Sequence, residues 1–180
     1  MLKLHGTGGL TRRTILKGAS ATLIVAAVTP AGVIIGRNAA WSATAEALSP
    51  ETFATLVQIS RDIYPHAQLE DKVYAAAVSA LDHAAKGDAA VKALLEDGVT
   101  ALDAAAAGMK AASYGAVPGE TERLALLLPI QADAFFQKVR GNLITGIYNN
   151  KEVWPIFGYE GESASKGGYI NRGFNDIDWL

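Results

Sequence analysis

The sequence predicts an all-α protein: a small helical bundle, preceded by a signal segment and followed by an irregular C-terminal arm rich in aromatic residues and glycine. From residue 46 onward, apolar residues recur with the helical period of about 3.6 residues, and no stretch alternates long enough for a strand. Residues 73–112 contain sixteen alanines, which favour helices. Residues 154–180 hold six of the fourteen aromatic residues of the chain and five of its glycines.

The length favours one folded core. The chain has 180 residues, of which 50% are hydrophobic, so it is too short for a catalytic domain beside a separate cofactor domain. We therefore expect a signal segment over residues 1–45, a helical domain over residues 46–153, and an extended arm over residues 154–180 that packs on a partner or on its own bundle.

The signal segment has the features of bacterial export. Arg12 and Arg13 lie within the sequence Thr-Arg-Arg-Thr-Ile-Leu-Lys of residues 11–17, which is typical of the twin-arginine (Tat) route for folded cargo. The alternative is an ordinary arginine pair at the start of a membrane helix.

The apolar stretch over residues 18–36 is followed by small residues that end in Ala43, Thr44 and Ala45, an A-x-A cleavage pattern. Glycines, hydroxyl residues and a proline weaken its hydrophobicity, as suits a Tat signal better than a permanent anchor. Cleavage after Ala40 and retention as an anchor stay open.

Helix starts and stops divide the rest of the chain. Ser49 and Pro50 predict a helix start at the N-cap and N1 positions, and Pro65 ends that helix. Further helices are expected over residues 71–85, from Asp88 to about residue 113, over residues 120–128, and from beyond Pro129 to residue 148. Glycines 98 and 108 predict a bend, a break or a close helix crossing in the third helix.

Each helix is expected to bury one face. The expected buried residues are, in helix order, Phe53, Leu56, Val57, Ser60 and Ile63; Val73, Ala77, Ala80, Leu81 and Ala84; Val91, Leu94, Leu95, Val99, Leu102, Ala105, Ala106 and Met109; and, in the last helix, Phe136, Val139, Leu143, Ile144 and Ile147.

Charge and cysteine content exclude several classes. Residues 1–45 carry five of the sixteen Lys and Arg and none of the eighteen Asp and Glu, so the folded part is acidic and has no basic cluster for nucleic acid. Cysteine is absent, which excludes disulfides, thiolate zinc sites, iron–sulfur clusters and c-type haem in this chain.

No catalytic constellation stands out. His5 lies in the signal segment, His66 follows a proline in a turn, and His83 follows Asp82 on a helix, so none forms a metal-ligand pair. No nucleophile elbow or nucleotide loop is present in the folded part. We expect a non-catalytic chain without a cofactor of its own.

The C-terminal arm is the candidate binding element. Its glycines exclude a long helix and its aromatics exclude a disordered linker, so it is expected to lie on its own bundle, on a partner, or on both with different halves. The candidate partner-binding residues are Trp154, Phe157, Tyr159, Tyr169, Arg172, Phe174 and Trp179.

Several of these motifs together resemble a known family. The twin-arginine start, the alanine-rich helices, Asp-Ile-Tyr-Pro at residues 62–65, and above all residues 149–161 and 168–179 are similar to the gluconate 2-dehydrogenase subunit 3 family. This family comprises small (gamma) subunits of bacterial membrane-bound sugar dehydrogenases, such as glucose, fructose and sorbitol dehydrogenase.

The resemblance implies a non-catalytic subunit that folds with, stabilises and escorts a large FAD-dependent catalytic subunit through the Tat route to the periplasm. FAD, with or without an iron–sulfur cluster, would belong to that large subunit, and haem c to a multihaem cytochrome c subunit in the same complex. The alternative is a stand-alone periplasmic helical binding module whose aromatic tail lines its own pocket.

Overall fold

The computed structural model describes residues 27–30, 32–36, 42–172 and 174, and these residues are mostly helical. A three-stranded antiparallel sheet comes first, with β1 (Ala27–Val28), β2 (Val33–Ile35) and β3 (Ser42–Thr44). The α-helices are α2 (Pro50–Ile63), α3 (Asp71–Gly87), α4 (Ala89–Ala107), α5 (Glu120–Leu127) and α6 (Ala134–Tyr148), and short 3-10 helices are η2 (Tyr114–Ala116), η3 (Leu128–Ile130), η4 (Trp154–Phe157) and η5 (Ser163–Lys166). The predicted mostly helical fold is confirmed, and the small sheet that precedes the helices was not predicted from the sequence.

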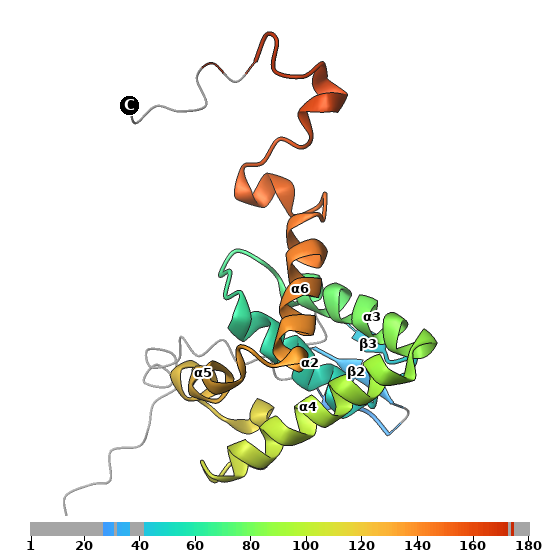
Figure 1. Ribbon diagram of the computed structural model, residues 1–180, viewed down its shortest axis with the longest axis vertical. Coiled ribbons are helices and arrows are strands. Elements are labelled where there is room, and N and C mark those ends of the chain that lie inside the picture. The colour runs from blue at the N-terminus through green and yellow to red at the C-terminus, as the bar shows by residue number, and fades with distance from the viewer. Residues whose placement is uncertain (1–26, 31, 37–41, 173, 175–180) are drawn as a thin grey trace, which may run out of the picture.

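Helix α3 is the centre of the bundle. It packs against α2, α4 and α6, and α2 in turn contacts α4, α5 and α6 (Figure 1). Small residues allow a close approach between α3 and α6, where a Cβ atom on Gly146 would come 2.8 Å from the Cβ atom of Ala77. At the same crossing, the Asn142 side chain donates a 2.8 Å hydrogen bond to the carbonyl of Ala77.

Helix α2 begins and ends where the sequence predicts. The Ser49 hydroxyl accepts a hydrogen bond from the backbone N–H of Thr52, Pro50 occupies the first turn, and the helix ends two residues before Pro65. The Glu96 carboxylate of α4 adds a cap that the sequence did not reveal. It accepts from the N–H of Ser49 at 2.6 Å and from the hydroxyl of Thr52 at 2.5 Å.

Helix α4 ends earlier than predicted. Its last residue is Ala107, followed by Gly108 as C-cap, whereas the apolar pattern suggested continuation to Ser113. Gly98 marks a close crossing, one of the outcomes expected for it: a Cβ atom there would come 2.2 Å from Cδ2 of Phe135. The missing side chain at residue 98 therefore makes room for the buried Phe135 ring.

The predicted buried faces are mostly correct, with five exceptions. The exposed members are Ala80, Ala84, Ala105, Met109 and Ile144, and the other residues of the predicted faces are buried or half-buried. Exposing an alanine costs little because its side chain is a single methyl group. Met109 lies beyond the end of α4, and Phe135 fills core space on α6 while Ile144 faces outward.

The sheet lies within the segment assigned to the export signal. Strand β2 is central and pairs with β1 and β3, and its Ile34 is fully buried against the helical core. The first two strands contact α2. Among the helices of the described ranges, none is both long enough and apolar enough for a bilayer crossing.

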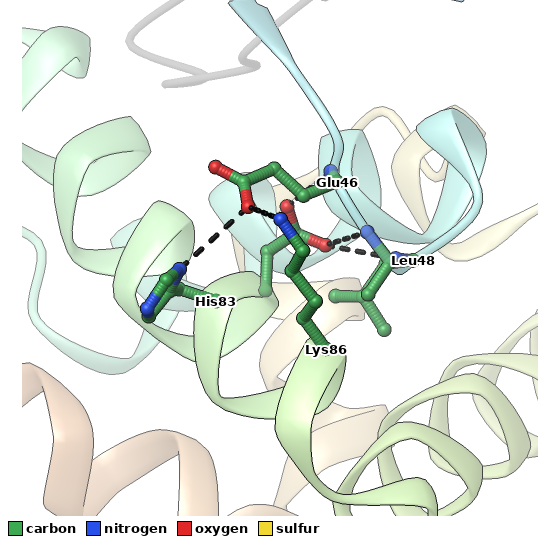
Figure 2. A network of polar contacts seen from close by, with 6 residues as sticks. Glu46, Leu48, His83 and Lys86 are labelled. Carbon is green, nitrogen blue, oxygen red and sulfur yellow. Dashed lines mark hydrogen bonds and ion pairs between the residues drawn. The ribbon is translucent and has the colours of Figure 1, made fainter.

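Asp82 connects this N-terminal region to the bundle. Its buried carboxylate, on α3, accepts hydrogen bonds from the backbone N–H groups of Glu46, Ala47 and Leu48 at 2.6, 3.0 and 2.8 Å. On the protein surface beside it, Glu46 pairs with Lys86 at 3.0 Å and lies 3.6 Å from His83 (Figure 2). The chain leading into α2 is thus held by side chains of α3.

A buried ion pair ties α5 to α2. Arg123 and Asp62 are 0% and 3% exposed, and the guanidinium donates to both carboxylate oxygens at 2.7 and 2.9 Å. The Tyr114 hydroxyl donates to the same carboxylate at 2.7 Å, and the Gln58 amide donates at 3.1 Å. Arg123 also donates to the carbonyl of Val117 at 3.0 Å.

The charges of this cluster stabilise one another. Burial alone would lower the pKa of Arg123, but the hydrogen bonds and charge of Asp62 raise it above its ordinary value. Burial, reinforced by the negative charge of Asp62, raises the pKa of the Tyr114 hydroxyl, which therefore stays protonated and remains a donor.

Replacing Asp62 by Asn leaves the Arg123 guanidinium buried without a counter-charge. We expect this variant to lose about 3–5 kcal/mol of unfolding free energy, because breaking a buried pair costs the desolvation of the remaining ion. The measurement is chemical denaturation monitored by circular dichroism. Glu70→Gln, which removes the exposed ion pair with Lys72, is the matched control and should unfold like the unaltered chain. Equal stability of the two variants would contradict the prediction.

Candidate functional site

The base of the C-terminal arm is anchored on the bundle. Val153 is fully buried, and Phe157 is half-buried against the core. The indole N–H of Trp154 donates to the carbonyl of Tyr148 at 2.8 Å, and its ring meets the ring of Tyr159 edge-on at 5.2 Å between centroids. Trp154 and Phe157, both proposed from the sequence as partner contacts, therefore first serve to seat the arm on its own chain.

An aromatic cluster forms this seat. His66, in the turn after α2, contacts Phe157 and Tyr148 edge-on at centroid distances of 4.9 and 5.7 Å and stacks with Tyr64 at 6.4 Å. A 2.7 Å hydrogen bond joins Nε2 of His66 to the hydroxyl of Tyr148. The cluster joins the end of α2, the end of α6 and η4. Sequence reasoning did not identify His66 or Tyr148 in this role, because the rings meet only after the chain folds.

The outer half of the arm presents apolar side chains to solvent. Figure 1 shows it leading away from the bundle beyond the C-terminal end of α6. The exposed fractions of Tyr159, Tyr169, Ile170 and Phe174 are 50%, 60%, 82% and 79%. Large exposed aromatics of this kind are typical of binding surfaces.

Polar side chains give the outer half its local order. Glu160 pairs with Arg172 and with Lys166, whose ammonium also donates to the carbonyl of Glu160. The hydrogen bond of Lys166, followed by the charges of Lys166 and Arg172, lowers the pKa of Glu160. The Nη1 atom of Arg172 has no hydrogen-bond partner among the described residues. This nitrogen is buried, so the polar partner contact predicted for Arg172 stays a prediction.

Two features extend the candidate surface. Ile144 and Tyr148 on α6, and Ile156 in η4, are 43%, 40% and 47% exposed, so the apolar surface continues from the arm onto the end of the bundle. A hollow of about 310 Å³ within the arm is lined by Gly158, Tyr159, Glu160, Gly161, Tyr169 and Arg172. The partner-binding residues predicted from the sequence were six aromatics and Arg172, so they included none of the three isoleucines along this surface, Ile144, Ile156 and Ile170. The sequence predicted Ile144 to be buried.

The remaining predicted site residues lie elsewhere. Arg12 and Arg13 of the signal and Trp179 of the arm fall outside the described residues. In the part of the chain that is described, no group of three His, Cys, Asp or Glu side chains is arranged to hold a metal ion.

Comparison with known proteins adds no assignment. No protein-family model matches the chain, and no curated protein or solved structure matches it. The resemblance to dehydrogenase small subunits therefore stays a prediction from the motifs.

His66 makes the seat of the arm sensitive to pH. Burial, together with the charge of Arg61, lowers the pKa of His66 in the folded chain, so folding favours the neutral ring. The unfolded chain binds more protons once the pH falls below about 6.5, and stability present above that pH is lost as the pH falls.

We therefore expect the thermal midpoint to fall between about pH 7.5 and about pH 5.5, and His66→Gln to show a smaller fall than the unaltered chain. Differential scanning calorimetry at both pH values measures the thermal midpoints of the unaltered chain and of the variants. His83→Gln, at an exposed histidine beside Glu46, is the control. If the two variants respond to pH alike, His66 is not the responsible group.

Proposed function

We propose that this chain is the non-catalytic small subunit of an exported FAD-dependent sugar or polyol dehydrogenase. In this role it folds with the large catalytic subunit, stabilises it, and escorts it through the Tat route to the outer face of the cytoplasmic membrane. FAD belongs to the large subunit and haem c to a cytochrome subunit of the same complex. The motifs at both ends of the chain support this assignment.

The observation that carries the proposal is the division of the arm into an anchored base and an exposed outer half. Val153 is buried and Phe157 packs on the core, whereas Tyr169 and Phe174 are mostly exposed. A tail that only covered its own bundle would bury its outermost aromatics, because each offers a large apolar surface. An arm that receives a partner leaves them accessible while its base fixes its direction.

The chemistry of the exposed surface fits a protein partner. Tyr159 and Tyr169 combine a large apolar ring with a hydroxyl, and aromatic and arginine side chains dominate the energetics of protein interfaces. Arg172, whose side chain is 31% exposed, is the proposed polar contact to a backbone carbonyl or a carboxylate of the partner. Ile144 and Tyr148 would add a contact from the bundle itself.

One observation favours a second candidate function, a stand-alone periplasmic binding module. The hollow beside Tyr159 and Tyr169 combines aromatic rings with the charged groups of Glu160 and Arg172. It lies entirely within the arm, so a small ligand there would need no other chain. Purification of the chain as a monomer without any partner, from the organism that encodes it, would favour this candidate.

Alanine substitutions at Tyr169 and Phe174 test the interface. Each variant should weaken capture of the flavoprotein by on the order of thirtyfold, about 2 kcal/mol, without changing the thermal midpoint of the isolated chain. The unchanged midpoint is expected because both side chains are mostly exposed. The measurement is recovery of a yellow flavoprotein with an antibody against the helical bundle.

Leu128→Ala is the matched control, because Leu128 is 61% exposed and lies in η3, outside the arm. It should retain full capture. Recovery of the flavoprotein at the level of the unaltered chain by both arm variants would refute the arm as the interface, and recovery of no flavoprotein by the unaltered chain would refute the assignment itself.

Replacing Arg12 and Arg13 by lysine tests the escort role. The folded domain should be unaffected, but the chain and the dehydrogenase activity of its partner should both remain in the cytoplasm, because export of the partner depends on this signal. Cell fractionation followed by an activity assay of each compartment shows where the dehydrogenase activity is located. A dehydrogenase that still reaches the periplasm in this variant is exported by other means.

A further inference from the structure

The strands β1 to β3 lie in the segment that the sequence assigns to the export signal, yet they contribute to the core of the helical domain. Ile34 of β2 is fully buried, and Val28 and Ala43 of the flanking strands pack against the core. The backbone pairing is specific: Val28 faces Ile34 in one pair of strands, and Ile34 faces Ala43 in the other. The sheet is a layer of the domain, in contact with α2.

The predicted cleavage site coincides with this layer. The A-x-A pattern consists of Ala43, Thr44 and Ala45, and its two small side chains are the features that a signal peptidase reads. In the folded chain, Ala43 is paired with Ile34, and both Ala43 and Ala45 pack against the core. The two side chains are therefore engaged in the fold, and their recognition by a peptidase requires β3 to leave the sheet.

The residues immediately after the site are also held. The backbone N–H groups of Glu46, Ala47 and Leu48 all donate to the Asp82 carboxylate, which is 2% exposed. Figure 2 shows Glu46 and Leu48 of this segment, with the Glu46 side chain paired with Lys86. The bond between Ala45 and Glu46 thus lies between a paired strand and a set of three hydrogen bonds.

Cleavage after Ala45 would also remove apolar surface from the core. The lost side chains would include Ile34, and the part of α2 that the sheet contacts would become exposed to water. Cleavage after Ala40 would remove Ile34 as well, because the whole of β2 precedes that position.

We propose that strands β1 to β3 belong to the mature folded domain, and that processing of the export segment removes only residues N-terminal to Ala27 or none. The folded sheet withholds the A-x-A site at Ala43 and Ala45 from a signal peptidase. This proposal depends on the proposed export of the chain but not on the proposed flavoprotein partner. The thermal test below depends on neither export nor the partner.

The first test determines the mature N-terminus. The full chain is expressed with its signal in a Tat-competent bacterium, recovered from the periplasmic and membrane fractions with an antibody against the bundle, and analysed by intact mass and N-terminal sequencing. A first residue at or before Ala27 is expected. A first residue between positions 28 and 46 overturns the proposal.

The second test asks whether the sheet stabilises the full chain. Ile34→Ala should lower the thermal midpoint by roughly 5–15 °C, and the milder Ile34→Val by about 2–5 °C. Ile35→Ala is the matched control, because this half-buried neighbour points to the opposite face of the strand. It should lower the midpoint by less than half as much as Ile34→Ala. If Ile34→Ala does not fold, the thermal midpoint of Ile34→Val is compared with that of the unaltered chain instead.

The same three variants also define the result that would overturn the proposal. Midpoints of Ile34→Ala, Ile34→Val and Ile35→Ala that all equal the midpoint of the unaltered chain would mean that the sheet does not contribute to the core, and would overturn the proposal. A failure of the chain to capture a flavoprotein would contradict the proposed function, but it would not bear on the contribution of the sheet to the core.

Discussion

The buried pair of Asp62 and Arg123 fixes the segment between α4 and α6 on α2. A carboxylate taken out of water needs its oxygens satisfied, and here a guanidinium, a tyrosine hydroxyl and a glutamine amide all converge on it. Tyr114 and Arg123 are brought to α2 from beyond the end of α4. The segment between α4 and α6 is held by this polar centre together with its own buried Tyr114, Val117 and Leu127.

The same principle recurs at the other irregular connections. Asp82 on α3 satisfies the N–H groups of residues 46–48, and Glu96 on α4 satisfies the N–H of Ser49 at the start of α2. Asp103, also on α4, accepts from the N–H of Tyr114 at 2.7 Å. Backbone groups in segments without regular structure need such partners when they are buried. The apolar faces of the helices therefore hold the bundle together, and carboxylates on the helices hold its connecting segments in place.

Local signals account for what the sequence predicted. Ser49 and Pro50 specify the start of α2 through its own backbone geometry, and Pro65 and Gly108 mark helix ends without reference to the rest of the fold. The sheet was missed because its strands have two or three residues, too few for an alternating pattern, and lie in a segment with the composition of an export signal. The pairing of Asp62 with Arg123 joins positions 61 residues apart, and no local pattern contains it.

The contact of Gly98 with the Phe135 ring limits how this chain can vary. Any side chain at position 98 would overlap the ring, whereas a smaller residue at position 135 would leave space that a methyl group at position 98 could fill. The two positions are therefore coupled, and the order of change matters: position 135 must become smaller first. Among homologous chains, an alanine at the first position should accompany a smaller residue at the second, which would appear as covariation between α4 and α6.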